Sequence, residues 1–153
     1  MIRAAEPGDL EAVVCINNQA TKWVGRKDRG FFETYLGLPF FRVLEAGGAV
    51  EGFLLAMGPE VEYDSRNFLW FRERFESFCY IDRVVVDEAL QRSGRGTLLY
   101  NDLIRRRGTV PLACEVCIDP LNAESVAFHE TFGFRETGVH KLGGKTLRMY
   151  LLR

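Results

Sequence analysis

The chain has 153 residues, of which 47% are hydrophobic and 27% charged, and its formal net charge is -1 at pH 7. This size and composition are typical of one folded domain that buries a core without disulfides or a structural metal. The near-neutral charge excludes proteins that hold nucleic acid through a surplus of cations. No apolar run reaches the roughly 18 residues of a membrane span, and the first residues lack a signal peptide's apolar stretch. We therefore expect a single cytoplasmic domain over residues 1–153, with no nucleic-acid or membrane partner.

The first part of the chain alternates helical and strand patterns. Leu10, Val13 and Ile16 recur at helical spacing after the break at Pro7. Two later apolar runs flank Gly47 and Gly48, a glycine pair typical of a hairpin turn. These patterns predict a short first strand, helices over 9–20 and around 31–35, and strands over 40–44 and 50–57.

The second part continues with strands over 78–86 and 112–118, helices over 96–107 and 122–132, and a closing hairpin over 134–139 and 147–152. A long polar and aromatic segment, 59–77, precedes them, and long excursions of this kind are more often functional than idle. Hairpins and crossover connections together predict one mixed sheet. The expected fold class is α/β (mixed α+β): a single, mostly antiparallel sheet of about seven strands flanked by about four helices.

The junction over 91–97 places glycines between a predicted strand and a predicted helix. Free backbone N–H groups at a helix N-terminus, together with the helix dipole, favour an anion, and glycine lets a phosphate approach the main chain. The segment does not match G-x-G-x-x-G, because position 99 is Leu99, and no G-x-x-x-x-G-K-[ST] is present. The junction therefore predicts a phosphate cradle of another kind.

Two motifs carry a family resemblance. The segment QRSGRG, Gln91–Gly96, fits the pattern Q/R-x-x-G-x-G/A and resembles the acetyl-coenzyme A signature of the GNAT superfamily of N-acetyltransferases. The segment NAESVAFHETFGF, Asn122–Phe134, resembles the later segment of that superfamily, a helix opened by asparagine and followed by Gly-Phe. The resemblance implies the fold of that superfamily and acetyl-CoA (coenzyme A) as co-substrate, with no metal.

The resemblance also implies which residues bind coenzyme A. Its pyrophosphate is expected on the amides of Arg92–Thr97, with arginine side chains adding charge. The backbone of the strand at 84–86 is expected to pair with pantetheine as a missing strand would. Asn122 is expected on the pantetheine arm or, alternatively, as a helix cap. The expected cofactor-binding residues are Val84, Val85, Val86, Gln91, Arg92, Ser93, Gly94, Arg95, Gly96, Thr97, Asn122, Ser125 and His129.

Acetyl transfer to an amine needs a base, because an alkyl ammonium has a pKa of about 10 and must lose a proton before it attacks. A thiol has a pKa of about 8.5 and leaves more readily. Strand alternation puts Tyr80 and Asp82 on one face. Asp82 is the first candidate base, with a salt bridge to an arginine as the equal alternative and Glu115 in reserve. The glutamate that many relatives carry around Tyr80 is absent here. The expected catalytic residues are Asp82, His129 and Tyr80.

His129 occupies the place where the superfamily often has a tyrosine, taken as general acid toward the thiolate. Histidine donates protons near neutral pH, so the resemblance implies the same role here. Helical spacing places Asn122, Ser125 and His129 on one face. The alternative for His129 is a partly exposed helix residue without a catalytic role.

The four cysteines lie in apolar segments, which predicts reduced, buried thiols. Cys114 and Cys117 form a C-x-x-C, but no second pair accompanies them and strand alternation sends them to opposite faces, so no metal is expected. No cysteine has a histidine nearby in the sequence. This disfavours a covalent acetyl-enzyme and favours direct attack by the amine in a ternary complex.

The acceptor is expected near Trp23, Tyr35 and the segment 63–75, where Glu60, Glu62 and Asp64 would attract an ammonium group. These aromatic residues could instead close a core or a homodimer interface. The sequence thus predicts an N-acetyltransferase acting on a primary amine of a small molecule. Acetylation of protein N-termini or lysines, or a non-catalytic acyl-CoA-binding sensor of the same fold, stay open as alternatives.

Overall fold

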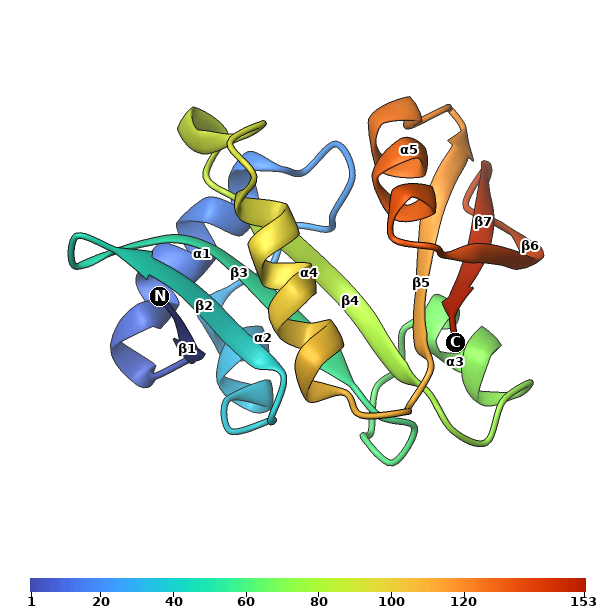
Figure 1. Ribbon diagram of the computed structural model, residues 1–153, viewed down its shortest axis with the longest axis horizontal. Helices are drawn as coiled ribbons and strands as arrows, with labels where there is room; N and C mark the ends of the chain where they lie inside the picture. Colours follow the sequence, from blue (N-terminus) through green and yellow to red (C-terminus); the bar gives the residue numbers. More distant parts are fainter. The chain divides into compact units, whose positions relative to one another are not determined.

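A computed structural model describes residues 1–153, and its elements follow the predicted order with one addition (Figure 1). The strands are β1 (Ile2–Ala4), β2 (Phe41–Ala46), β3 (Ala49–Met57), β4 (Cys79–Val86), β5 (Leu112–Asp119), β6 (Arg135–Leu142) and β7 (Lys145–Leu152). The helices are α1 (Leu10–Gln19), α2 (Arg29–Tyr35), α3 (Arg66–Arg72), α4 (Arg95–Arg106) and α5 (Ala123–Thr131), with 3-10 turns η1 (Pro7–Asp9) and η2 (Glu88–Leu90).

The strands form one sheet in the order β1-β2-β3-β4-β5-β7-β6. The β1–β2, β2–β3, β5–β7 and β6–β7 pairs are antiparallel, whereas β4 and β5 run parallel through the residue pairs Cys79/Leu112 and Tyr80/Ala113. This confirms the predicted mixed, mostly antiparallel sheet of seven strands.

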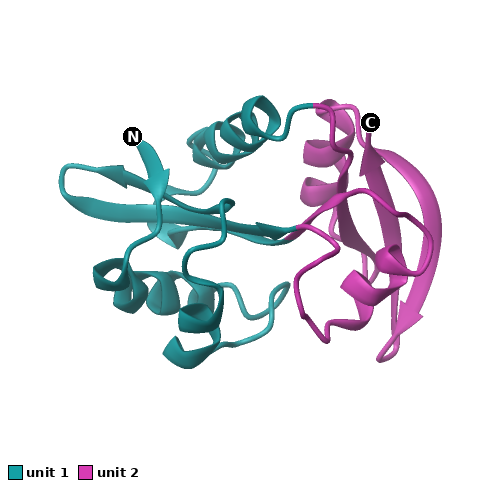
Figure 2. Ribbon diagram, turned by 90° about the horizontal axis from the view of Figure 1, so that it is seen from below, with its two compact units in different colours: residues 1–57, 82–108 teal, residues 58–81, 109–153 magenta.

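The chain divides into two compact units (Figure 2). Unit 1 comprises residues 1–57 and 82–108, and unit 2 comprises residues 58–81 and 109–153. The division falls within β4, after Ile81. The single domain over residues 1–153 therefore stays a prediction.

Unit 1 has helices on both faces of its strands. Figure 2 shows α4 on one face of β1–β3, and α1 with α2 on the other. Because both faces are covered, β3 is buried at six successive positions, Gly52–Met57, instead of at alternate ones. On the α2 side, the Phe32 and Phe53 rings pack edge to face at 5.5 Å. On the α4 side, Leu99 and Leu103 are each 1% exposed, which anchors α4 by its apolar stripe.

Unit 2 contains the one helix that the sequence analysis did not predict, α3, so the structure has five helices and not about four. Ser65 begins α3, because its hydroxyl accepts a hydrogen bond from the Phe68 amide at 3.4 Å. Phe68 and Phe71 are fully buried and their rings contact those of Phe78 and Tyr80. The four consecutive apolar residues Phe68–Phe71 conceal the helical spacing of the two that are buried.

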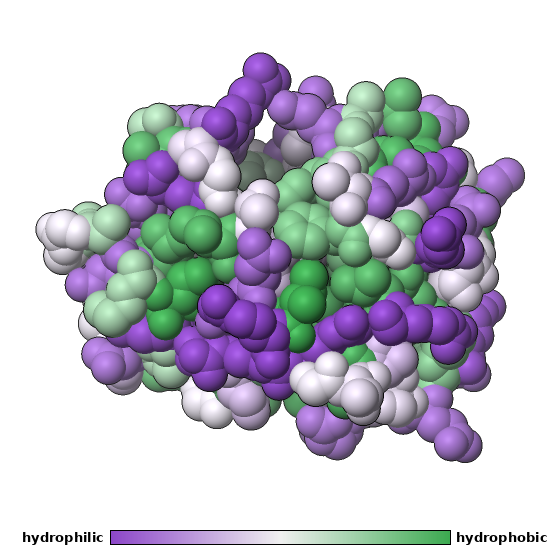
Figure 3. Space-filling model, in the orientation of Figure 1, coloured by the Kyte–Doolittle hydropathy of each residue, from purple (hydrophilic) through white to green (hydrophobic).

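No helix of the structure is both long and apolar enough to cross a membrane. On the face drawn in Figure 3, hydrophobic residues lie in patches that hydrophilic residues separate. The large hydrophobic side chains that are exposed come from well-separated positions in the sequence: Met1, Trp23, Leu98, Leu121 and Val139.

Candidate active site

The loop before α4 leaves the first amides of that helix without a side-chain cap. Helices α2, α3 and α5 each begin at a residue whose side chain accepts a hydrogen bond from the first turn, whereas α4 begins at Gly94, which has no side chain. Gly94 has φ +82°, in the left-handed region. The amides of Arg95, Gly96 and Thr97 form the first turn and have no partner within the helix. This end of α4 therefore has the geometry of an anion cradle.

The residues just before Gly94 shape the loop. Arg92 is exposed and has φ +62°, an uncommon value for a residue with a side chain. The Ser93 hydroxyl donates to the Leu90 carbonyl, and the side-chain amide nitrogen of Gln91 lies 3.5 Å from the Val86 carbonyl oxygen. The side chains of Gln91 and Ser93 thus fold back on the loop, and the motif contributes mainly its backbone.

Strand β3 supports this cradle from within unit 1. Glu51 accepts a hydrogen bond from Arg95 Nε at 2.5 Å, and its backbone carbonyl accepts one from the Asp87 amide at 2.9 Å. The Arg95 guanidinium lowers the pKa of the Glu51 carboxyl. Arg95, which the sequence analysis expected on phosphate, is therefore paired with Glu51.

Gly52 lies beside the predicted pantetheine-binding strand. A Cβ atom at Gly52 would stand 2.9 Å from the Val85 carbonyl oxygen and 3.4 Å from Val86 Cα. Val85 is buried, whereas Val84 and Val86 are half-buried. Only glycine at this position lets β3 and the end of β4 approach so closely.

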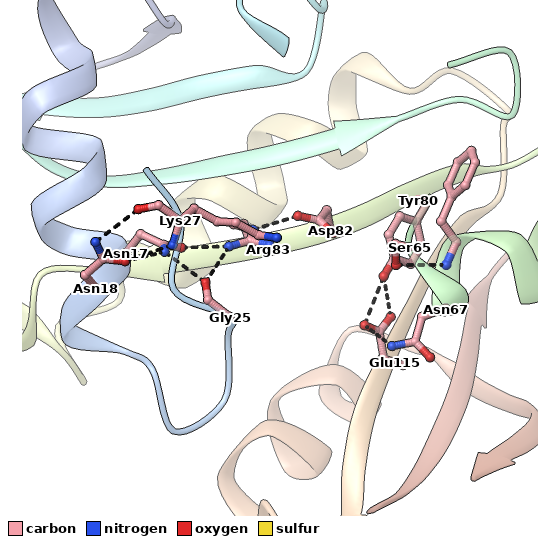
Figure 4. A network of polar contacts seen from close by, with 11 residues as sticks. Asn17, Asn18, Gly25, Lys27, Ser65, Asn67, Tyr80, Asp82, Arg83 and Glu115 are labelled. Carbon is pink, nitrogen blue, oxygen red and sulfur yellow. Dashed lines mark hydrogen bonds and ion pairs between the residues drawn. The ribbon is translucent and has the colours of Figure 1, made fainter. Parts of the chain in front are cut away.

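Asp82, the first candidate base, forms a buried ion pair with its neighbour Arg83 at 2.6 Å (Figure 4). Both side chains are largely buried, at 5% and 6% exposed. Arg83 Nη1 also donates to Asn17 Oδ1 and to the Gly25 carbonyl, each at 3.0 Å. The geometry therefore favours the salt-bridge alternative for Asp82, in a network that ties β4 to α1 and the loop after it.

In unit 2, Tyr80 and Glu115 contact each other directly (Figure 4). The Tyr80 hydroxyl lies 2.9 Å from both carboxylate oxygens of Glu115, and Asn67 Nδ2 donates to Glu115 Oε1 at 3.1 Å. Tyr80 is 1% exposed and Glu115 is half-buried. Hydrogen bonds to a carboxylate favour its charged form, which is the form that accepts a proton. Glu115, the reserve candidate, is therefore a half-buried carboxylate that two hydrogen-bond donors hold in place.

Helix α5 begins at Asn122, whose side chain accepts a hydrogen bond from the Ser125 amide at 3.2 Å, which confirms the capping alternative. One turn further on, the Ser125 hydroxyl lies 3.2 Å from His129 Nδ1, so these two residues share a face as predicted. His129 Nδ1 also donates to the Ser125 carbonyl at 2.7 Å.

His129 is 6% exposed and stacks on Tyr150 with ring centroids 6.0 Å apart, so it is not the partly exposed residue of the alternative reading. Burial lowers the pKa of His129, against the opposing effect of its hydrogen bond to Ser125. At neutral pH the ring is therefore neutral, with its proton on Nδ1. This state does not favour the general-acid role that the resemblance implied.

The cysteines are free, and three of the four are buried; Cys15 is exposed, which corrects the expectation that all four lie in the core. Burial raises the pKa of the Cys114 thiol well above its ordinary value. Cys114 and Cys117 both lie buried in β5, as predicted, and the structure holds no group of three or more His, Cys, Asp or Glu that could bind a metal ion.

Three aromatic residues of the segment 59–77, Tyr63, Phe68 and Phe71, are buried in the interior of unit 2. Tyr63 is 9% exposed and packs against Phe68. Trp70 lies against Gly138, where an added Cβ would stand 2.7 Å from the indole ring. Tyr63 thus belongs to the core, as the alternative expected, whereas Trp70, Phe75 and Tyr35 are half-buried and Trp23 is exposed. Glu60, Glu62 and Asp64 are exposed.

The sequence profile of the Acetyltransferase (GNAT) family matches residues 20–134, three quarters of the chain, including both motifs. The chain belongs to this family. The chain is thus a GNAT N-acetyltransferase, and acetyl-CoA is the co-substrate typical of this family. No curated protein matches its sequence.

Solved structures agree with the GNAT assignment. The ribosomal-protein-alanine N-acetyltransferase of Brucella melitensis is 26% identical with a TM-score of 0.75, the match covering 99% of this chain and 98% of that one. The yncA protein of Salmonella typhimurium, solved with its cofactor acetyl-CoA, is 24% identical (TM-score 0.73; 100% and 92% covered). An N-acetyltransferase of Staphylococcus aureus is 21% identical (TM-score 0.73; 99% and 96% covered). The last two likenesses show the GNAT fold alone.

Two residues of these sites were missed in the sequence analysis. Glu51 supports the cradle and Asn67 contacts Glu115, yet neither lies in a motif. Their partners are 44 and 48 residues away in the sequence. No local signal would have identified them.

Proposed function

We propose that this GNAT acetyltransferase transfers the acetyl group of acetyl-CoA to the primary amine of a small molecule by direct attack, with Glu115 as the base. The observation that carries this proposal is the Glu115 carboxylate, held by hydrogen bonds from Tyr80 and Asn67. The roles of individual residues below are part of the proposal.

The uncapped first turn of α4 supports a role in binding the diphosphate of acetyl-CoA. The amides of Arg95, Gly96 and Thr97 offer three donors at the positive end of the helix dipole. Arg92, exposed beside them, adds positive charge. The backbone of Val84–Val86 is the proposed partner of the pantetheine arm.

Glu115 would take the proton that the amine must lose. The amine nitrogen forms a bond to the acetyl carbon while the bond from that carbon to sulfur breaks, and the electron pair of that bond leaves with the sulfur. Tyr80 holds the carboxylate by its hydroxyl group. We assign Asp82 to the support of Arg83 and not to proton transfer.

The departing thiolate needs little help, because thiols ionise near about 8.5. We therefore assign His129 a packing role against Tyr150. The raised pKa of Cys114 keeps it protonated, which supports direct attack over an acetyl-cysteine intermediate. Four free thiols also support a reducing compartment such as the cytoplasm.

The exposed carboxylates Glu60, Glu62 and Asp64 support a small cationic amine as the acceptor, because they would attract an ammonium group. The second candidate acceptor is a protein N-terminus. It is favoured by the 26% identical relative from Brucella melitensis, which is described as a ribosomal-protein-alanine N-acetyltransferase. A homodimer is compatible with either acceptor.

The test measures release of the coenzyme A thiol from acetyl-CoA. One set of acceptors contains small mono-, di- and polyamines, and the other contains short peptides with a free N-terminal alanine. The same peptides with an acetylated N-terminus are the matched control. We expect thiol release with at least one small amine, at least about tenfold above hydrolysis without acceptor. Activity on free peptides alone would replace the small-molecule proposal with the second candidate. If none of the amines or free peptides caused thiol release above hydrolysis, both candidates would be contradicted.

A further inference from the structure

The contact of Asn67 with Glu115 is one half of a longer chain of hydrogen bonds within unit 2. While Asn67 Nδ2 donates to Glu115 Oε1 at 3.1 Å, Asn67 Oδ1 lies 3.0 Å from His140 Nδ1. The three residues come from α3, β5 and β6. All three side chains are half-buried, so the surrounding packing restricts them.

We propose that Asn67 and His140 are positioning residues for the base: His140 fixes the orientation of the Asn67 amide, and that amide holds the Glu115 carboxylate beside Tyr80. The inference rests on the proposed role of Glu115. It adds two residues, from α3 and β6, that neither motif contains.

The orientation of the amide follows from its two ends. A carboxylate accepts hydrogen bonds only, so the Asn67 NH₂ group must face Glu115. The carbonyl end then faces His140, where it needs a donor, and an N–H on His140 Nδ1 supplies it. If the amide turned over, its oxygen would face the carboxylate and two acceptors would repel each other. Both neighbours of Asn67 therefore select the same orientation.

His140 satisfies this requirement in either protonation state. Burial lowers the pKa of His140, and the positive charges of Arg66 and Arg74 lower it further, against the opposing charge of Glu73. The ring is therefore neutral near pH 7, with its single proton on Nδ1 as the contact requires. Protonation at lower pH adds a proton at Nε2 and leaves the Nδ1 donor in place.

A purely structural role is the competing explanation, since the same contact ties α3 to β6. The groups that face Glu115 decide between the two. Tyr80 and Asn67 both donate to its carboxylate, and the neighbouring Cys114 thiol is uncharged. Loss of the Asn67 donor makes the charged carboxylate less stable, so the enzyme would lose activity at a higher pH as the solution is acidified. A merely structural contact would not move that limb of the pH profile.

The experiment measures kcat and kcat/KM between pH 5 and 9 for the wild type and five variants. Asn67→Leu removes both hydrogen bonds, His140→Phe removes the outer one, and His140→Asn restores a donor, because its Nδ2 takes the place of Nδ1. Glu115→Gln is the reference for loss of the base. Lys141→Gln is the matched control, since Lys141 is exposed and adjacent to His140 on β6.

We expect Asn67→Leu to lower kcat about tenfold with KM for acetyl-CoA within about twofold, and to raise the acid limb by about 0.5 to 1 pH unit. His140→Phe should lower kcat about threefold and move the acid limb in the same direction as Asn67→Leu does. His140→Asn and Lys141→Gln should match the wild type. If Glu115→Gln removes the acid limb while Asn67→Leu and His140→Phe keep the wild-type profile, the positioning roles are wrong. If Glu115→Gln itself keeps the wild-type rate and limb, the proposed base is wrong.

A second measurement does not depend on activity or on the folding of any variant. The ¹⁵N chemical shifts of the His140 ring in the wild-type protein at pH 7 report which nitrogen carries the proton. A proton on Nδ1 supports the chain. A neutral ring protonated at Nε2, with Nδ1 bare, would overturn it.

Discussion

The guanidinium of Arg95 lies 2.5 Å from the carboxylate of Glu51, which joins the first residue of α4 to β3. The backbone carbonyl of Glu51 also holds the Asp87 amide at the end of β4. One residue of β3 thus holds both the strand end and the helix start between which the proposed phosphate cradle lies. The cradle therefore has a fixed geometry within unit 1, and substitutions that disturb this geometry should weaken acetyl-CoA binding.

Gly94→Ala tests the conformation of the cradle. Space around Gly94 is open, so a methyl group meets no neighbour, but φ +82° costs alanine about 1 kcal/mol. We expect the Kd for acetyl-CoA, measured by calorimetry, to rise about fivefold as the loop relaxes toward negative φ. Gly8→Ala is the control, because Gly8 also has open space but no positive φ. Equal affinity in the two variants would argue against a preformed cradle.

Gly52→Ala tests the close approach of β3 to the proposed pantetheine-binding strand. The new Cβ would stand 2.9 Å from the Val85 carbonyl oxygen, so one of the strands must shift. We expect a loss of about 1 to 3 kcal/mol in the free energy of unfolding, together with weaker acetyl-CoA binding. Denaturant unfolding and calorimetry measure the two effects. Wild-type values for both would contradict the constraint that we place on β4.

Asp82→Asn separates the supporting role of Asp82 from a role as base. The substitution leaves the buried Arg83 without its carboxylate partner, although Asn17 and the Gly25 carbonyl still accept from it. We expect a loss of about 3 kcal/mol in the free energy of unfolding, and an acid limb of the pH–rate profile that stays in place. A variant of wild-type stability whose acid limb disappears would return the base to Asp82.

His129→Phe tests the burial of the neutral imidazole. The pKa of His129 is lowered from its ordinary value of 6.5 by burial, so below about pH 6.5 the unfolded chain binds a proton that the folded one does not. The stabilising contribution of the neutral ring is complete above pH 6.5 and is lost as the pH falls toward the lowered folded-state value.

We expect the free energy of unfolding of the wild type to fall between pH 7 and pH 5, and the slope to be smaller in His129→Phe. Some slope should remain, because the pKa of His140 is also lowered. Unfolding by urea at several pH values provides the measurement. An unchanged slope in the variant would mean that His129 titrates alike in the folded and unfolded chains.

The order and type of most elements could be predicted from the sequence, because local signals mark them. Gly47 and Gly48 adopt the positive φ of a tight hairpin turn, and Gly108 ends α4 with φ +64°, as their positions indicate. Helix α3 was missed because only two of its residues, Phe68 and Phe71, are buried, so the helical spacing occurs a single time. Helix α3 is therefore defined by its packing inside unit 2, and a local sequence pattern does not show that packing.

The candidate site was only partly predictable, for a physical reason. A backbone cradle needs glycine at a particular place in the sequence, so Gly94 was found from its motif. The roles of acidic side chains depend instead on partners supplied by the fold. Neighbours on a strand point to opposite faces, so the sequence did not indicate that Asp82 would pair with Arg83. Glu115 stood out only once Tyr80 and Asn67 were seen to contact it.

The central claim is that main-chain amides at the start of α4 bind the diphosphate of acetyl-CoA. An NMR titration that follows the backbone amides of the ¹⁵N-labelled protein tests it directly, with S-acetyl-pantetheine as the ligand that lacks the diphosphate. We predict that acetyl-CoA shifts the amide signals of Gly94–Thr97 strongly and that S-acetyl-pantetheine leaves them near their starting positions. Saturation with acetyl-CoA that moves other amides but not these four would contradict the claim.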